Sequence, residues 1–379
     1  MITEGVGFTG FNLSKKLYQT FEKNYLMLLI IFSLMLLFSS YIFYILMAFL
    51  YLPKKVIKKE KSINLNKRGL IVIPVLNGSS KIESRINNIC NYCDKKKFDL
   101  LIISDGSKDN TFEIANEIRK KHDKEEKLRI FVHQNKENIG RALTHNFAVQ
   151  KYNYYYYIFS DLDTEFTSSF PIFCANQLLN DDKCMASSGR VSFKSQKNYG
   201  RILSKLFLLE VLIRWIANFS AMGMKGSGPA LCIKRECWKN LENYEDIDHC
   251  AGFMAKNKGG YLSYLIDSTV IDLANETQKK DLKARRRMTR KSLLSYFKQI
   301  ANFKIKDIDS FLAIFGYTLH KPLRFFAFPF LIFSSLIFIQ NKFGLIYSLI
   351  SILIFLYLPY IRIIKIIFLS FIFGIYDFL

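Results

Sequence analysis

Short apolar runs alternate with segments of helical periodicity in the first half of this chain. The apolar runs predict buried strands at residues 69–74, 99–104, 128–132 and 154–160. Between the strands, apolar side chains three or four positions apart predict helices at residues 81–93, 111–121 and 139–150. Strands and helices in this order predict a parallel sheet with helices on both faces, which binds ligands beyond the carboxyl ends of its strands.

The second half of the chain has a mainly helical pattern. Residues 199–222 predict an amphipathic helix, and the glycine-rich residues 223–233 predict a loop that enters a strand. A further helix is expected to begin near Asp246 and to run through Met254. Residues 292–322 carry an apolar stripe that is typical of helices lying on a membrane surface.

Long uncharged runs stand near both ends of the chain. Residues 25–52 would form roughly 42 Å of helix at ~1.5 Å per residue, enough to cross a hydrocarbon core of about 30 Å. Residues 325–341 and 343–361 predict a second and a third transmembrane helix. The other expected parts are an N-terminal amphipathic segment, a basic linker, a cytosolic domain and an interfacial C-terminal segment, at residues 1–24, 53–68, 69–291 and 362–379.

The formal net charge of +22 could indicate nucleic-acid binding, but many of the basic residues flank the uncharged runs. Basic residues are more numerous after residues 25–52 than before them, which places the middle of the chain in the cytosol. Seven scattered cysteines with no disulfide framework agree with a cytosolic domain. The sequence therefore predicts a multi-pass protein of the cell membrane that contacts membrane lipid and binds no nucleic acid.

Asp161 and Asp163 follow one of the predicted strands and are separated by a single residue. Because the strand carries both carboxylates to its carboxyl end, we expect them at the ligand-binding edge of the sheet. Two oxygen donors on one short turn suit Mg²⁺ or Mn²⁺, ions that bridge phosphate oxygens. The pair therefore predicts a site for Mn²⁺ or Mg²⁺.

Other polar residues are expected at the same edge. Pro74 and Asn77 follow the first strand, and Asp105 ends the second. The turn that Asp105 opens lacks the glycine and the glutamate of a calcium-binding EF-hand loop. Arg141 stands at a helix start, where free N–H groups and a forked cation attract phosphate. Together with the metal pair, these residues predict a nucleoside diphosphate site.

Four segments carry a resemblance to glycosyltransferase family 2, the inverting nucleotide-sugar enzymes with a GT-A fold. They are residues 71–77, 104–111, 138–142 and 160–164, and the resemblance extends over residues 69–290. It implies a Rossmann-like mixed α/β sheet, here with transmembrane helices at both ends as in the membrane-bound polysaccharide synthases. It also implies that Pro74, Asn77, Asp105, Arg141 and Asp161 bind the donor, and that Asp161 and Asp163 bind the metal.

The acceptor half of such synthases has a glutamate-aspartate pair, which Glu245 and Asp246 resemble. The resemblance makes Asp246 the candidate general base, although both acids could instead cap the helix that follows them. The Q-x-x-R-W segment of the synthases is degenerate here. Arg287 matches its arginine and is a candidate donor-binding residue, but Ala284 and Met288 replace the glutamine and the tryptophan, which argues against processive synthesis.

The resemblance implies transfer of a hexosyl or N-acetylhexosaminyl group from a nucleotide-diphosphate sugar to a hydroxyl of a glycan or lipid-linked glycan, at the cytosolic face, in polysaccharide biosynthesis. One alternative is transfer to a polyprenyl or dolichyl phosphate, whose ionised oxygen needs no general base. A second alternative is a catalytically inactive nucleotide-binding membrane adaptor. Because the metal pair and Asp246 are all present, the first function is favoured.

Overall fold

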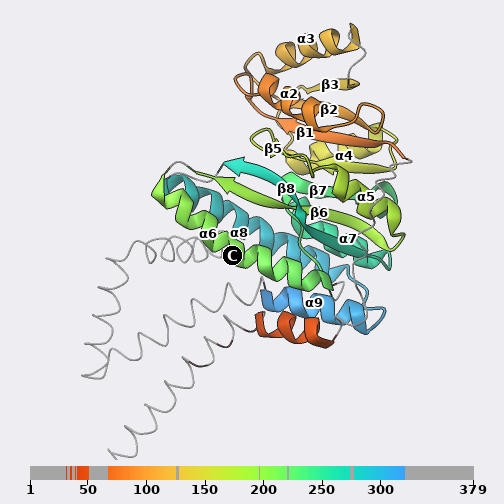
Figure 1. Cartoon of the computed structure of the whole chain (residues 1–379), viewed down its shortest axis with the longest axis vertical. Coiled ribbons are helices and arrows are strands. Elements are labelled where there is room, and N and C mark those ends of the chain that lie inside the picture. The colour runs from red at the N-terminus through yellow and green to blue at the C-terminus, as the bar shows by residue number, and fades with distance from the viewer. Residues whose placement is uncertain are drawn as a thin grey trace, which may run out of the picture.

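One mixed sheet organises the structure, which is a computed structural model. The residues that it describes are 31, 35, 39, 41–50, 67–124, 128–195, 197–219, 222–273 and 277–320. Within them, the strand order is β3-β2-β1-β4-β7-β6-β8-β5 (Figure 1). The strands are β1 (Gly69–Val75), β2 (Phe98–Asp105), β3 (Ile130–Asn135), β4 (Tyr156–Phe159), β5 (Glu165–Phe166), β6 (Cys184–Lys194), β7 (Leu231–Lys234) and β8 (Tyr261–Leu273).

The sheet is parallel in its first half and mixed in its second. β1 pairs with β2 and β4 in parallel, and β2 pairs with β3 in parallel. β7 then runs antiparallel to both β4 and β6, whereas β6 and β8 are parallel neighbours. The short β5 closes the far edge by antiparallel pairing with β8. The predicted parallel sheet is thus confirmed over β1 to β4, and the predicted mixed sheet is confirmed for the whole.

Helices cover both faces of the parallel half. Besides the helical residues 41–50, the structure has the α-helices α2 (Ile82–Tyr92), α3 (Thr111–Lys124), α4 (Arg141–Lys151), α5 (Ile172–Asn180), α6 (Asn198–Phe219), α7 (Ile247–Asn257), α8 (Gln278–Ala301) and α9 (Ile308–His320). Along β1, Ile71 and Ile73 pack into the cluster shared with α2, α3 and α5. Leu70 and Val72 point to the opposite side, where α4 and α7 complete a second cluster. The alternation follows from the period of two along a strand, and both faces are apolar because both are covered.

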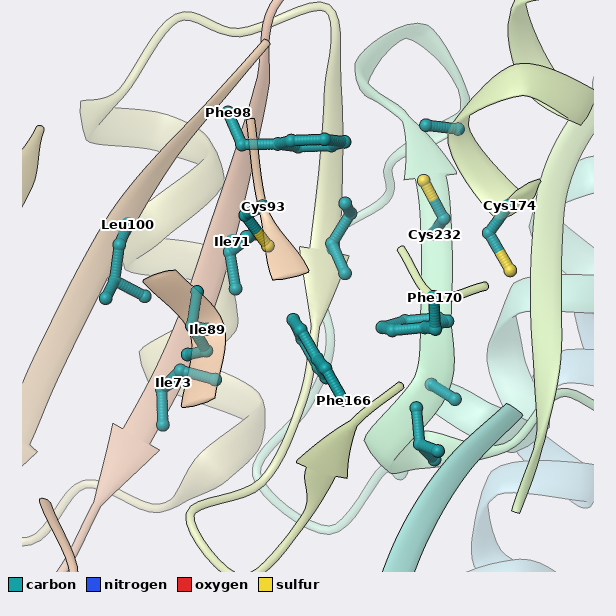
Figure 2. Packing of buried hydrophobic residues seen from close by; sticks show 14 of the residues in the cluster. Ile71, Ile73, Ile89, Cys93, Phe98, Leu100, Phe166, Phe170, Cys174 and Cys232 are labelled. Atoms are coloured by element: carbon teal, nitrogen blue, oxygen red, sulfur yellow. The ribbon is translucent and has the colours of Figure 1, made fainter. Parts of the chain in front are cut away.

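The first cluster extends from the parallel strands to the mixed half of the sheet. Figure 2 shows Phe98 and Ile71 on one side of it and Phe170 and Cys232 on the other. Phe166 lies between the two groups, with its ring centroid 4.7 Å from that of Phe170. Because one apolar cluster spans both halves, the two halves of the sheet fold as one unit.

A third cluster lies between α6, α7, α8, α9 and the helical residues 41–50. Phe253 of α7 and Tyr317 of α9 are buried at its centre, with ring centroids 5.5 Å apart. Gly252 lets α7 approach the backbone of Met224 closely, because a Cβ at residue 252 would lie 2.3 Å from the carbonyl oxygen of Met224. This packing fixes α7, and with it Asp246, against α8 and α9.

The predicted transmembrane helices at both ends are wrong for the part of the chain that the structure describes. No helix among the described residues is both long and apolar enough to cross a bilayer. Residues 1–24, 325–341, 343–361 and 362–379 lie outside the described residues. Within 25–52, residues 41–50 form a helix whose Tyr44 is buried in the third cluster, so apolar residues of this run pack against protein.

The boundaries of the later helices also differ from the prediction. α8 begins at Gln278, well before residue 292, and a short connection separates it from α9. The earlier start has a physical reason, since Thr277 caps the helix by accepting a hydrogen bond from the backbone N–H of Lys280. The polar first half of α8 carries no apolar stripe, which is why periodicity alone placed the start too late.

Candidate active site

The turn after β4 holds the two predicted metal ligands. Ser160 is buried there, its N–H donates to the carbonyl of Val72 at 3.2 Å, and its hydroxyl donates to the carbonyl of Pro229 at 2.7 Å. These bonds anchor the turn to β1 and to the short 3-10 helix at Gly228–Ala230. Asp161 and Asp163 therefore leave the sheet at the carboxyl end of β4, as the sequence predicts.

Each of these carboxylates faces a cation. Arg141 lies 3.0 Å from Asp161, and Lys81 lies 2.6 Å from Asp163. The side chain of Asp163 is 51% exposed, so its pairing with Lys81 contributes little to stability. Both carboxylates are thus accessible. Lys81 was not predicted as a partner, because it precedes a helix that is distant in the sequence.

Asp105 is turned toward the protein and not toward open space. It is buried, and its carboxylate accepts hydrogen bonds from the backbone N–H groups of Ile139 and Gly140 at 3.1 and 3.0 Å. Gly140 has a φ of 89°, which glycine adopts without strain. Arg141 follows as the first residue of α4. Asp105 therefore positions the start of α4, and through it the guanidinium that faces Asp161.

Asp105→Asn should disturb this helix start. An amide has one accepting oxygen in place of two, so at least one buried N–H group would lose its partner, at a cost of about 1 to 3 kcal/mol in the free energy of unfolding. We expect nucleoside diphosphate binding to weaken as well, because Arg141 loses its support. Denaturant unfolding and calorimetric titration measure the two effects. The exposed Asp123 of α3 gives the control Asp123→Asn, and equal stability and affinity in both variants would contradict this role.

Pro74 and Asn77 lie at the same end of the sheet as Asp105. Pro74 is within β1, opposite Ile103 of β2, and Asn77 is exposed in the loop that follows. The side-chain oxygen of Asn77 accepts a hydrogen bond from the N–H of Lys108 at 2.8 Å. This hydrogen bond holds the loop after β1 against the loop after β2, at the edge of the sheet next to Asp105.

Asp246 lies at the start of α7 but does not cap it with its side chain. The carboxylate instead lies 3.6 Å from Arg141 and 3.5 Å from Lys291 of α8. Its backbone carbonyl accepts the hydrogen bond from the N–H of Cys250 that begins the helix. The alternative that this carboxylate merely caps α7 thus finds no support in the geometry. Arg141 brings Asp246 and Asp161 together, although they are far apart in the sequence.

Glu245 has a different environment from its neighbour. Its side chain is buried and accepts hydrogen bonds from the side-chain amide of Gln299 at 2.6 Å and from the N–H of Glu242 at 2.7 Å. Both oxygens are therefore engaged in holding α8 and the preceding turn against α7. Of the two acids, only Asp246 is placed to receive a proton from a bound molecule.

A second set of charged side chains lies beside Asp246. Asp248 lies 3.6 Å from Lys225, whose ammonium also contacts Nε2 of His249 at 3.1 Å. Burial alone would raise the pKa of Asp248, but the nearby cationic groups, His249 and Lys225 foremost, hold that pKa below its usual value. Burial lowers the pKa of Lys225. This group of Lys225, Asp248 and His249 was not predicted, because its members come from a loop and a helix start with no shared motif.

The glycine-rich loop carries Lys225 past the site. Arg214 of α6 donates a hydrogen bond to the carbonyl of Gly226 at 3.1 Å and another to Ser227 at 2.8 Å. A Cβ on Gly228 would lie 4.0 Å from both Nη1 of Arg141 and Cβ of Asp248. Gly228 therefore borders the space between Arg141 and Asp248.

Arg287 is exposed on α8, one helical turn before Lys291. Residues four apart lie on the same side of a helix, so Arg287 lies on the side of α8 that Lys291 extends toward Asp246. Its role at the diphosphate stays a prediction. Lys291 itself was not predicted, and its spacing of four residues from Arg287 was the signal that could have identified it.

Asp272, near the end of β8, is a further acid close to the predicted metal pair. Burial raises its pKa to about 6, and the negative charges of Asp161 and Asp163 act in the same direction. Among the described residues, no group of three or more histidine, cysteine or acidic side chains could hold a metal ion. Two accessible carboxylates on one turn do fit Mg²⁺ or Mn²⁺, because such ions are commonly bound by one or two carboxylates together with substrate phosphates.

The sequence of this chain is similar to that of one family of known proteins. Residues 70–253 match the profile of Glycosyl transferase family 2. The chain is 28% identical to poly-beta-1,6-N-acetyl-D-glucosamine synthase of Staphylococcus aureus over 156 residues. This matched stretch is 41% of this chain and 35% of that protein. The chain thus spans about a third of the length of the curated relatives that it matches. These matches support a glycosyltransferase of family 2.

A solved structure with a similar fold is the mannosyltransferase PcManGT from Pyrobaculum calidifontis, in complex with GDP-Man and Mn²⁺. The similarity has a TM-score of 0.69, covers 92% of this chain and 98% of that one, and has 15% sequence identity. At this identity the likeness shows the fold alone. The mixed sheet of the present chain is accordingly a GT-A sheet.

Proposed function

We propose that this protein is an inverting glycosyltransferase that moves a sugar from a nucleotide-diphosphate sugar to a hydroxyl of a glycan or lipid-linked glycan. The observation that carries the proposal is the position of Asp246. Its carboxylate does not cap α7 and lies 3.6 Å from the same Arg141 that holds Asp161 at the sheet edge. A base and a diphosphate-binding cation next to each other are what sugar transfer to a hydroxyl requires.

Different residues of the site would act on the donor and on the acceptor. Asp161 and Asp163 would hold Mn²⁺ or Mg²⁺, which would neutralise charge on the donor diphosphate when bound. Arg141 is placed to move from the carboxylates to the phosphate oxygens, and Arg287 would assist from α8. The mannosyltransferase PcManGT, described with GDP-Man and Mn²⁺, has a similar fold and thus supports this choice of donor class and metal.

Asp246 acts on the acceptor. A sugar hydroxyl is a weak nucleophile, so removal of its proton during attack lowers the barrier. The acceptor oxygen bonds to the anomeric carbon while the bond from that carbon to the diphosphate oxygen breaks. The hydroxyl proton passes to Asp246, and the nucleoside diphosphate leaves beside Arg141. Attack opposite the leaving group inverts the anomeric configuration.

The acceptor contacts are proposed to lie along α8. Ala284 and Met288 stand at the positions of the glutamine and tryptophan of the synthases, and Met288 is exposed. Small or flexible side chains there favour the addition of one or a few sugars over processive synthesis. We also propose a cytosolic catalytic domain, since all seven cysteines are free thiols, as in a reducing compartment. The location at a cell membrane stays a prediction.

A donor screen tests the proposal. The purified full chain is incubated with radiolabelled UDP- and GDP-sugars, with Mn²⁺ or with a chelator, and with either oligosaccharides or polyprenyl phosphate. We expect metal-dependent donor turnover and transfer to an oligosaccharide that requires Asp246. A lipid product that is labile to mild acid and forms without Asp246 would indicate a polyprenyl-phosphate acceptor. Inactivity with every donor would indicate the nucleotide-binding adaptor.

A further inference from the structure

One exposed side of α8 carries a run of positive charge. Four basic residues stand at positions i, i+4, i+8 and i+11 of the helix, and we name them the basic stripe: Lys279, Lys283, Arg287 and Arg290. At 100° per residue, this spacing places all four on one side of the helix. All four are exposed, and they extend over roughly 16 Å of helix at ~1.5 Å per residue.

No acid of α8 balances the basic stripe. The one acidic residue in the helix, Asp281, is buried on the opposite side, where it pairs with Arg285 at 2.9 Å and accepts a hydrogen bond from Tyr199. Like charges three or four residues apart on a helix destabilise it. Because α8 has no acidic residue next to the basic stripe, an anionic partner would relieve the repulsion between the stripe residues.

The basic stripe ends at the proposed base. Lys291 follows Arg290 directly and lies 3.5 Å from Asp246. The inner face of α8 is fixed to α7, because Ser292 contacts Nε2 of His249 at 2.7 Å and the N–H of Asp246 donates to Ser295 at 3.3 Å. A molecule that lies along the stripe would thus present its end to Asp246, and it would do so from the side of α8, away from the metal pair.

On the basis of the proposed function, we propose that the basic stripe binds an acceptor that carries phosphate groups. Arginine binds phosphate through two parallel hydrogen bonds, and two of the four stripe residues are arginines. The donor diphosphate is assigned to Arg141, the metal pair and Arg287. The other three residues of the stripe are therefore left for negative charge on the acceptor, which is held along α8 while its hydroxyl reaches Asp246.

A membrane surface fits the basic stripe less well than a phosphorylated acceptor does. A helix that lies in the interface of a bilayer inserts an apolar face. On α8, Leu293 and Tyr296 are buried within the protein, and the exposed apolar residues Met288 and Phe297 lie opposite the basic stripe and beyond its end, respectively. The stripe itself contains no apolar residue to insert.

The test compares two soluble probes, fluorescently labelled chitobiose and its 1-phosphate, for binding to the full chain in the presence of a nucleoside diphosphate. The test variant is Lys279→Gln/Lys283→Gln/Arg290→Gln, which spares Arg287 and Lys291. Its matched control is Lys120→Gln/Lys121→Gln/Lys124→Gln, which removes three exposed charges from α3, at an end of the molecule remote from α8 (Figure 1).

We expect the phosphorylated probe to bind about tenfold more tightly than the neutral one, since several exposed charge pairs contribute together. The α8 variant should lose most of this preference, and the α3 variant should keep it. Equal binding of the two probes to the unmodified protein, or equal loss in both variants, would overturn the proposal.

Vesicle binding and donor hydrolysis are measured on the same proteins. If the α8 variant keeps the preference but binds vesicles containing phosphatidylglycerol less tightly, the basic stripe is a membrane contact and the proposal is wrong. An unmodified protein that turns over the donor but shows no phosphate preference overturns this inference alone. An unmodified protein that turns over no donor contradicts the proposed function.

Discussion

Asp246→Asn should lower sugar transfer by about 10² to 10⁴ while nucleoside diphosphate affinity changes by no more than a few-fold. The amide keeps the shape of the side chain but cannot take a proton at neutral pH. The helix start should survive, since the hydrogen bonds that begin α7 are accepted by the backbone carbonyl of residue 246 and not by its side chain. Transfer assays and calorimetry on the same preparation measure the two quantities.

Glu245→Gln is the matched comparison for this variant. Glu245 is buried and accepts two hydrogen bonds, so its amide should lower the free energy of unfolding and affect transfer only through stability. Asp161→Ala should differ from both, because it weakens nucleotide binding at the sheet edge. Transfer at the unmodified rate by Asp246→Asn would show that this carboxylate is not the base.

The parallel half of the sheet was predictable because its local pattern and its tertiary environment agree. β1, β2 and β4 are buried on both faces, so each carries an apolar run in the sequence, whereas the edge strand β3 is mostly half-buried and only its first half is apolar. β6 was not predicted, since it contains Ser187, Ser188 and Gly189 at buried positions. Small residues are needed in this part of β6 because the loop after α6 packs against it, as in the hydrogen bond that the N–H of Ser227 donates to Ser188 at 2.7 Å.

The ends of the chain show the limit of hydropathy as a signal. An uncharged run predicts a membrane helix when nothing else can bury it. One side of residues 41–50 has such an alternative, because Tyr44 and Phe43 pack against α9, where Phe43 and Phe315 have ring centroids 5.4 Å apart. Periodicity does not distinguish a lipid partner from a protein partner.

The candidate site was predictable where its residues share an edge of the sheet. Asp161, Asp163 and Arg141 follow from strand ends and a helix start, and the structure brings them together. Asp105 follows from the same argument, but a sequence does not show which way a carboxylate turns, and here it binds the backbone of α4. Lys291 was missed for a different reason, since it reaches Asp246 from α8, which only the packing of the third cluster places beside the sheet.

Asp163→Asn should lower turnover by two or more orders of magnitude, which corresponds to ~3 kcal/mol of transition-state stabilisation. The variant keeps one oxygen donor but loses one of the two charges that would hold the metal, so more Mn²⁺ should be needed to restore the remaining activity. Stability should hardly change, because the side chain is 51% exposed and its ion pair with Lys81 lies at the surface.

Metal titrations of activity, combined with thermal unfolding, test this expectation for Asp163→Asn. Lys81→Met is the matched control, since it breaks the same ion pair from the other side and leaves both carboxylates in place. We expect that control to need no additional Mn²⁺, because removal of the cation leaves the carboxylates at least as attractive to a metal. Near-normal turnover by Asp163→Asn, or loss of folded protein in place of activity, would contradict the metal assignment.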